Sequence, residues 1–370
     1  MREEFIFVFC LLFGLQHSGG QNLNVQEVVE TFRTTYDVPA IAASVILEDT
    51  IYFGVSGYKS IDLKNSVDVN SKFHLGSNAK AITATIAATL VEKGAIEWGT
   101  KLLEVIPELR NEIHAGYSDT NLQDLLSNRS KMHAFEDDGS KEWRNIPKTI
   151  PTANDQKLEF ARYALQLKPV KWKKDKNHYY SNGGFIVAAL MLERRSGLSW
   201  ETLSTELFNN LGLKIYNGFP IQEKIGETQG HKKKGKSYEA IGPEEEYPLD
   251  SYFTPAGNQS MNIADLSKFI QLHLKGLMGT DNFLKSESFH KMHFGASDYA
   301  LGWYNGNIGD SQQRFSYHGG SLGTFSSAII LSADRKIAIV ILVNADNKEV
   351  ITLKDELRTK LWEAYGAKEQ

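Results

Sequence analysis

The feature that most constrains the fold is an uninterrupted apolar run near the end of the chain. Residues 337–343 read IAIVILV, without the polar alternation of a strand that has one face in water. Such a segment is expected at the centre of a sheet, with both of its faces covered. Two β-branched stretches near the start, 40–47 and 51–58, predict an antiparallel strand pair. Residues 314–318 and 325–331 predict two more strands, so we expect a sheet built from both chain ends.

Helical patterns dominate the middle of the chain. The alanine-rich stretch 77–93 ends at Gly94, a favoured residue after a helix C-terminus, and predicts one long buried helix. Apolar residues at helical spacing predict further helices at 122–126, 158–167, 185–195 and 264–274, and a last one from 350 to 361.

These patterns predict an α/β (α+β) fold, in which an antiparallel β-sheet is flanked by helices and carries an inserted all-α lobe. We expect an α/β lobe from residues 21–75 and 291–370, and a mainly helical lobe from residues 76–290.

The first residues have the pattern of a secretion signal. An apolar run from Phe5 to Leu15 follows Arg2, and small residues close the segment. We expect a signal peptide at 1–20, a mature domain at 21–370 and a secreted, extracellular protein. A buried N-terminal helix is the competing interpretation, and a mitochondrial transit peptide is a third, disfavoured because the segment is not Arg-rich. The run is too short for a membrane span, which needs about 20 apolar residues.

Secretion has consequences for cysteine and asparagine chemistry. The single cysteine, Cys10, lies inside the expected signal, so the mature chain would have no disulfide, no thiol nucleophile and no Cys-bound metal. Asn128 and Asn258 each begin an N-x-S pattern and are candidate N-glycosylation sites if the chain enters the secretory pathway.

Charge gives little information about partners. The 41 Lys and Arg residues nearly balance the 45 Asp and Glu residues, so no overall field points to nucleic acid or to a membrane surface. One basic run stands out, formed by Lys168, Lys171, Lys173, Lys174 and Lys176. It is either a solvated loop or a surface for a polyanionic matrix.

Ser77 and Lys80 are the first candidates for chemistry. They lie three residues apart at the start of the alanine-rich helix, a spacing that puts both side chains on one face. A serine hydroxyl needs a nearby base to become a nucleophile, and a lysine can act as that base when burial lowers its pKa. Because a buried lysine without a purpose would be costly, this pattern favours a catalytic pair.

Two further motifs complete the candidate site. Tyr180 could shuttle a proton and Asn182 could orient the pair, although a core tyrosine with a helix-capping Asn is the alternative. His318, which precedes Gly319, Gly320 and Ser321 at a predicted strand edge, could contact substrate. The backbone N–H groups of Ser77 and Ser321 would then form an oxyanion hole, whereas the alternative is a glycine-rich turn with an incidental histidine.

The three motifs, in this order, resemble the serine β-lactamase and penicillin-binding-protein superfamily, in particular its class C branch of β-lactamases, D-alanyl-D-alanine carboxypeptidases and related esterases. The resemblance spans nearly the whole mature chain and includes three further matches, at residues 73–76, 255–257 and 301–303. It implies that Ser77 is acylated, that Lys80 and Tyr180 move protons, and that Asn182 and His318 line the site. No metal or organic cofactor is required.

Two departures from the family pattern affect the expected substrate. His318 replaces the lysine that many β-lactamases use to hold a substrate carboxylate, which favours ester or peptide substrates. Residues 125–132 read LLSNRSKM where relatives usually show Leu-Leu-x-His-x-Ser-Gly-Leu, so the floor of the site is expected to differ.

The sequence therefore predicts a secreted serine hydrolase that forms an acyl-enzyme on Ser77 with a small acyl or peptide substrate, at an ester, amide or β-lactam-like carbonyl. The alternative is a non-catalytic secreted protein of the same fold with a binding or extracellular-matrix role.

Overall fold

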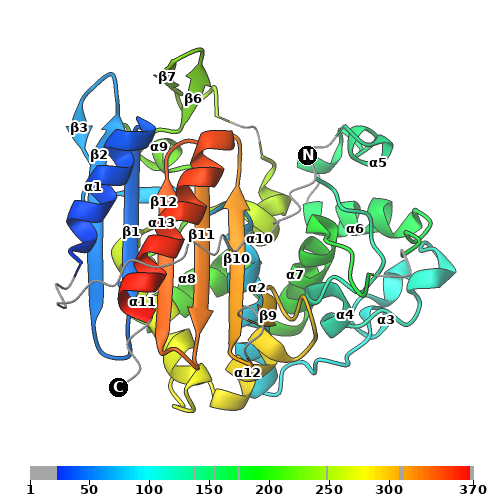
Figure 1. Cartoon of the computed structure of the whole chain (residues 1–370). Coiled ribbons are helices and arrows are strands. Elements are labelled where there is room, and N and C mark those ends of the chain that lie inside the picture. The colour runs from blue at the N-terminus through cyan, green and yellow to red at the C-terminus, as the bar shows by residue number, and fades with distance from the viewer. Residues whose placement is uncertain are drawn as a thin grey trace.

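The central sheet joins the two ends of the chain. The structure is a computed structural model that describes residues 23–136, 139–152, 155–172, 176–246, 249–307 and 312–366. Its seven-stranded antiparallel sheet has the order β3-β2-β1-β12-β11-β10-β9 (Figure 1). The strands are β1 (Ala40–Ile46), β2 (Ile51–Ser60), β3 (Asn65–Ser66), β9 (Tyr304–Asn307), β10 (Arg314–Ser321), β11 (Ser326–Ser332) and β12 (Ile337–Val343). The predicted sheet from both chain ends is confirmed.

The apolar run occupies the middle strand, as its composition predicts. All residues of β12 are buried, between β1 on one side and β11 on the other. Alternate side chains enter different cores because successive side chains of a strand point to opposite faces. Ile339 and Ile341 pack with the helices α1 (Val25–Tyr36) and α13 (Lys348–Gly366), and Val340 and Leu342 belong to the larger core on the other side.

Helices cover both faces of the sheet. In Figure 1, α1 and α13 lie over one face, and α11 (Ile263–Leu277) packs against β1 and β12 from the other. The remaining helices are α2 (Ala79–Glu92), α3 (Leu102–Val105), α4 (Leu122–Leu126), α5 (Lys141–Arg144), α6 (Gln156–Gln166), α7 (Asn182–Ser196), α8 (Trp200–Asn210), α9 (Pro220–Glu223), α10 (Thr254–Gly257) and α12 (Ser286–Phe294). The fold class is confirmed, and the proposed lobe boundaries stay a prediction.

Two small sheets lie outside the pattern that the sequence predicts. One has the order β4-β8-β5 and consists of β4 (Lys72–His74), β8 (Gln259–Asn262) and β5 (Tyr216–Asn217). The other is the hairpin of β6 (His231–Lys234) and β7 (Ser237–Ala240). These strands are too short for a clear period-2 pattern. The first sheet matters for function because β4 leads directly into Ser77.

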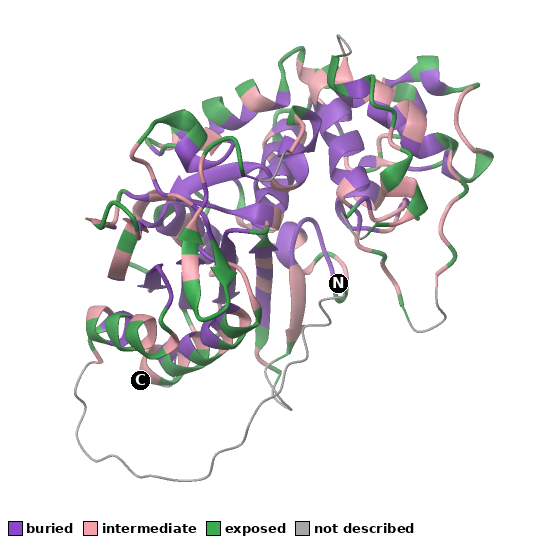
Figure 2. Ribbon diagram, turned by 90° about the horizontal axis from the view of Figure 1, so that it is seen from above, coloured by how far each residue is buried: buried purple, intermediate pink, exposed green. Residues whose placement is uncertain are grey.

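Helices α2 and α7 form the interior of the helical part. Most residues of both helices are buried, and α2 packs against α7, α8, α10 and α12. In Figure 2, buried residues gather in the interior of the molecule. Helix α7 begins at the N-cap Ser181, whose side chain accepts a hydrogen bond from the Gly184 N–H, and ends at Gly197 in the left-handed conformation. Four of the active-site candidates lie at or next to the N-terminal ends of these two helices: Ser77, Lys80, Tyr180 and Asn182.

The structure contradicts the two glycosylation candidates. The side chains of Asn128 and Asn258 are buried, at 1% and 9% exposure. Asn128 Oδ1 accepts a hydrogen bond from the Ser181 N–H, and Asn258 Oδ1 lies 3.1 Å from His74 Nε2. An N-linked sugar attaches to the amide nitrogen, and these buried side chains do not present that nitrogen to solvent, so the N-x-S patterns do not mark accessible sites in this fold.

Three other sequence expectations concern the surface and the N-terminus. The expected signal at 1–20 lies outside the described residues, as do Lys173 and Lys174 of the basic run. Lys168, Lys171 and Lys176 are exposed, which fits either interpretation of that run. Within the described ranges, no helix is both long and apolar enough to cross a bilayer.

Candidate active site

Ser77 lies on a short 3-10 turn, η1 (Gly76–Asn78), between β4 and α2. The residue before it must be glycine: Gly76 has a φ of +53°, and a methyl group at its Cα would lie 2.7 Å from the Ser321 nitrogen. This glycine lets the backbone of η1 touch strand β10. The Ser77 side chain is partly exposed, so a substrate can reach its hydroxyl.

Lys80 is fully buried one turn into the helical region. Its Nζ lies 3.2 Å from Ser77 Oγ and donates to Asn182 Oδ1 and to the Ala256 carbonyl, each at 2.6 Å. Burial lowers the pKa of Lys80 from 10.5 to about 7, while the more distant Glu136 opposes this by favouring the charged form. The sequence prediction that α2 desolvates Lys80 next to Ser77 is confirmed.

Tyr180 and Asn182 approach Lys80 from the start of α7. Lys80 Nζ lies 4.7 Å from the centroid of the Tyr180 ring. Asn182 Nδ2 donates to the Phe135 carbonyl at 2.9 Å, which fixes the amide so that Oδ1 faces Lys80. Ser181 caps α7 in place of Asn182, so the alternative of a capping Asn182 is wrong.

The segment that departs from the family pattern holds this motif in place. Asn128, Lys131 and Phe135 all have positive φ angles, which are uncommon for residues other than glycine. This bent backbone presents three carbonyls to the start of α7: His133 O accepts from Ser181 Oγ, and Ala134 O and Phe135 O accept from Asn182. These carbonyls directly follow the altered segment 125–132, and within that segment Asn128 accepts from the Ser181 N–H through Oδ1 and from the Tyr179 N–H through its carbonyl, so it also supports the start of α7.

His318 lies on β10 opposite these helices and is 2% exposed. Its Nδ1 lies 2.7 Å from the Gly319 carbonyl, which can only accept, so Nδ1 carries the proton. Burial, and secondarily the charge of Lys80, lowers the pKa of His318 to about 3. The ring is therefore neutral at pH 7, and the lone pair on Nε2 faces the Tyr299 hydroxyl at 3.4 Å.

The candidate oxyanion hole lies where η1 meets the end of β10. Gly320 permits the contact, because a methyl group at its Cα would lie 1.9 Å from the Leu75 carbonyl oxygen. Ser321 is the next residue of β10, and its hydroxyl donates to the Asp346 carboxylate. Among the described residues, the backbone N–H of Ser77 donates to no acceptor, which leaves it open to a substrate oxygen.

Sequence reasoning missed several residues of the site. Ala256 supplies a backbone carbonyl to Lys80, and a backbone contact leaves no signal in side-chain chemistry. Tyr299 and Tyr304 pack beside Tyr180 and His318, with the rings of Tyr180 and Tyr304 stacked at 6.3 Å. Both tyrosines lie close in sequence to residues 301–303, which match the family pattern, and that match was the signal in the sequence that could have pointed to them.

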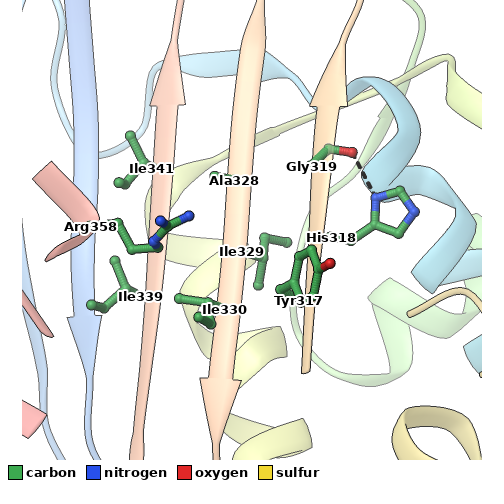
Figure 3. A pocket seen from close by; sticks show the side chains of 9 residues that line it. All are labelled: Tyr317, His318, Gly319, Ala328, Ile329, Ile330, Ile339, Ile341 and Arg358. Carbon is green, nitrogen blue, oxygen red and sulfur yellow. Dashed lines mark hydrogen bonds between the residues drawn. The ribbon is translucent and has the colours of Figure 1, made fainter. Parts of the chain in front are cut away.

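The site contains no clear place for a metal. Among the described residues, no group of three or more His, Cys, Asp or Glu side chains could hold an ion. A small cavity on the side of the sheet that α13 covers is lined by Arg358 and, among others, by His318 and Gly319 of the candidate site (Figure 3). Tyr317 lines this cavity, and the ring of His318, the next residue of β10, points to the other side.

Comparison with known proteins gives a consistent result. Residues 25–361 match the family described as Beta-lactamase. Protein flp of Staphylococcus aureus (strain NCTC 8325 / PS 47) is 20% identical over 338 residues, which cover 88% of this chain and 63% of that protein. Unguisins hydrolase ungD of Aspergillus violaceofuscus is 27% identical over 184 residues, which cover 46% of this chain and 30% of that protein. The chain spans less than two thirds of the length of these curated relatives.

Two solved structures share the fold. The octameric penicillin-binding protein homologue from Pyrococcus abyssi superposes with a TM-score of 0.72 at 18% identity, over 93% of this chain and 78% of that one. The crystal structure of SurE gives a TM-score of 0.71 at 19% identity, over 92% of this chain and 75% of that one. The family match over residues 25–361 shows that the chain belongs to the beta-lactamase family, and the two solved structures show the same fold.

Proposed function

We propose that the protein is a serine hydrolase that forms an acyl-enzyme on Ser77. The contact between Lys80 and Ser77 carries the proposal, because a lysine with a pKa of about 7 is neutral in a large fraction of molecules at neutral pH. Among the described residues, no carboxylate forms an ion pair with Lys80 within 4.0 Å, and the two acceptors to which it donates at 2.6 Å, Asn182 Oδ1 and the Ala256 carbonyl, are uncharged.

The proposed reaction has two halves, formation of the acyl-enzyme and its hydrolysis, and one proton passes through the site in each half. Neutral Lys80 takes the proton of Ser77 as Oγ bonds to the substrate carbonyl carbon. The negative oxygen of the tetrahedral intermediate accepts hydrogen bonds from the N–H groups of Ser77 and Ser321. Protonated Lys80 passes this proton to Tyr180, whose hydroxyl protonates the leaving group as its bond to carbon breaks, so that Lys80 and Tyr180 are both neutral again. In the second half, a water gives a proton through Tyr180 to neutral Lys80 as its oxygen bonds to the acyl carbon. The bond from that carbon to Ser77 Oγ then breaks, the acid is released, and Lys80 returns the proton to Ser77 Oγ.

The wall opposite Ser77 favours a substrate without a carboxylate beside the reacting carbonyl. His318 is neutral, and its only N–H is already bound to the Gly319 carbonyl. It therefore offers a substrate anion neither charge nor a free donor, in contrast to a lysine at this position. We infer that neutral esters or amides are better substrates than penicillins, whose carboxylate would find no cation here.

The proposal includes a location outside the cytoplasm, which rests on the apolar run before residue 20 alone. Comparison of the N-terminal residue of the protein recovered from medium with that of the intracellular chain tests this part separately.

Mass spectrometry of the intact protein tests the reaction. After exposure to a fluorophosphonate, wild type should gain one adduct and Ser77→Ala none. Ser326→Ala is the matched control, because Ser326 also contacts a lysine but is buried at 1% exposure, and it should label like wild type. Penicillin should give little adduct under the same conditions. Equal labelling of Ser77→Ala and wild type would reject Ser77 as the nucleophile, and no adduct on wild type would favour the non-catalytic binding or matrix role.

A further inference from the structure

We propose that Asn78 and Ser327 act together as positioning residues, which hold the backbone N–H of Ser77 in register with that of Ser321. This inference rests on the proposed function. The two side chains form a hydrogen-bonded link, the Asn78–Ser327 clamp, between the turn that carries Ser77 and the sheet that carries Ser321.

The Asn78–Ser327 clamp forms hydrogen bonds to the chain on both sides of Ser77. Asn78 Nδ2 donates to Ser327 Oγ at 2.7 Å, and Ser327 Oγ donates to the Leu75 carbonyl at 2.7 Å. One hydroxyl of β11 is thereby bonded to the residue directly after Ser77 and to the residue two before it. The side chains of Asn78 and Ser327 are buried, at 2% and 0% exposure, so water does not compete for these bonds.

The position of Ser327 in the sheet explains why this link bears on the oxyanion hole. Ser327 pairs with Gly320 in the ladder between β11 and β10, and Gly320 directly precedes Ser321. The Leu75 carbonyl also packs against Gly320, at a distance that excludes any side chain there. The clamp therefore fixes the two candidate oxyanion donors, Ser77 N–H and Ser321 N–H, to the same pair of strands.

The stability of the fold alone does not explain why residue 78 is an asparagine. Its Oδ1 is buried without a hydrogen-bond partner among the described residues, which costs free energy relative to an apolar side chain of the same shape. Leucine has nearly the same shape and would remove this cost. A polar residue kept at a destabilising position, one residue after the nucleophile, indicates a function in placing the turn.

The prediction for the reaction follows from the geometry of an oxyanion hole. One such donor contributes about 100-fold to 1,000-fold in kcat, and a displaced donor loses part of that effect. Because the clamp touches no substrate, its loss should lower kcat and leave KM nearly unchanged. We expect Ser327→Ala to lower both kcat and the rate of fluorophosphonate labelling about 10-fold to 100-fold.

Asn78→Leu separates positioning from folding. It should lower the labelling rate about 3-fold to 10-fold, since Ser327 keeps its bond to Leu75, while the melting temperature stays the same or rises. The double variant should show less than the product of the two single effects, because both substitutions break one link. If Ser327→Ala fails to fold, the Asn78→Leu result alone decides the question.

Ser332→Ala is the matched control for removal of a buried hydroxyl. Ser332 is also on β11, is fully buried, and donates to the Arg314 carbonyl of β10 at 2.8 Å, near the far end of the strand from Ser327. It should label at the wild-type rate even if it melts at a lower temperature. Labelling of Ser327→Ala and Asn78→Leu within twofold of wild type would overturn the inference. Failure of wild type itself to label would instead reject the proposed function.

Discussion

Two contacts between a serine hydroxyl and a buried lysine can be compared in this molecule. In the first, Lys80 lies beside Ser77 at the start of α2. In the second, Lys354 of α13 donates to the hydroxyl of Ser326 at the start of β11. Both contacts join a serine hydroxyl to a lysine side chain, and both lysines are buried, Lys80 at 0% and Lys354 at 7% exposure. Only their surroundings differ, so the surroundings decide which pair can do chemistry.

The first difference is access to the serine. Ser77 is partly exposed, whereas Ser326 is buried at 1% exposure and its hydroxyl lies 3.5 Å from the Gly320 carbonyl. The second difference is the neighbourhood of the lysine. Lys80 is bordered by the ring of Tyr180, which can pass on a proton, and by a neutral amide that holds it in place. Each lysine also donates to a backbone carbonyl, Lys80 to Ala256 O at 2.6 Å and Lys354 to Ser327 O at 3.4 Å, so this feature does not separate the two contacts. A Ser–Lys distance alone therefore does not define a catalytic pair.

Lys80→Met should produce the largest difference between the two contacts. Loss of the general base is expected to lower kcat/KM for a neutral ester by about 100-fold to 10,000-fold. Met fills a similar volume without a titratable group, so the fold should persist, and circular dichroism can check this. A variant that retains more than about a tenth of wild-type activity would show that another group deprotonates Ser77.

Tyr180→Phe tests the proton path from Lys80 to the leaving group. The ring that packs over Lys80 and against Tyr304 remains, and only the hydroxyl is lost. We expect kcat to fall by about 100-fold for an alkyl ester and by much less for a p-nitrophenyl ester, because that leaving group departs without a proton. Equal losses for both esters would contradict proton delivery by Tyr180.

The pH profile should identify Lys80 as the titrating base. The pKa of Lys80 is about 7, and the neutral form is the active one, so kcat/KM should rise with pH. Below pH 7 the rise should be about tenfold for each pH unit, and above pH 7 it should level off. Lys354→Met should keep this inflection, whereas the residual activity of Lys80→Met should lose it. A flat profile between pH 5.5 and 8.5 in wild type would contradict the assignment.

The comparison also shows how much the sequence could predict. The central place of residues 337–343 in the sheet followed from their apolar composition, and the pairing of Ser77 with Lys80 followed from helical spacing, since both are local patterns. Asn182 was assigned as an orienting residue, and the structure adds that Ser181 takes the capping function. The contact of Lys354 with Ser326 joins residues 28 positions apart, and no pattern in the sequence marks it.

The remaining features depend on tertiary packing. The neutral form of His318 follows from its burial and its bond to the Gly319 carbonyl, neither of which the sequence shows. The N-x-S patterns at Asn128 and Asn258 look identical whether the side chain is exposed or buried, and here both are buried. Residue types therefore indicated the candidate site, while the access of its residues to solvent and the protonation state of His318 could be described only from the fold.

Lys354→Met should give the smallest effect on activity, and it is the most direct test of whether the Lys354–Ser326 contact contributes to activity at all. The substitution removes donors to Ser326 Oγ and Ser327 O behind the sheet, and it should lower the free energy of unfolding by about 1–2 kcal/mol. Urea unfolding measures this loss. Because neither bond involves the hydroxyl of Ser327 or a group that faces the substrate, kcat/KM should stay within about twofold of wild type. A tenfold loss with full folding would mean that Lys354 acts on the site through β11, and the two Ser–Lys contacts would then belong to one functional unit.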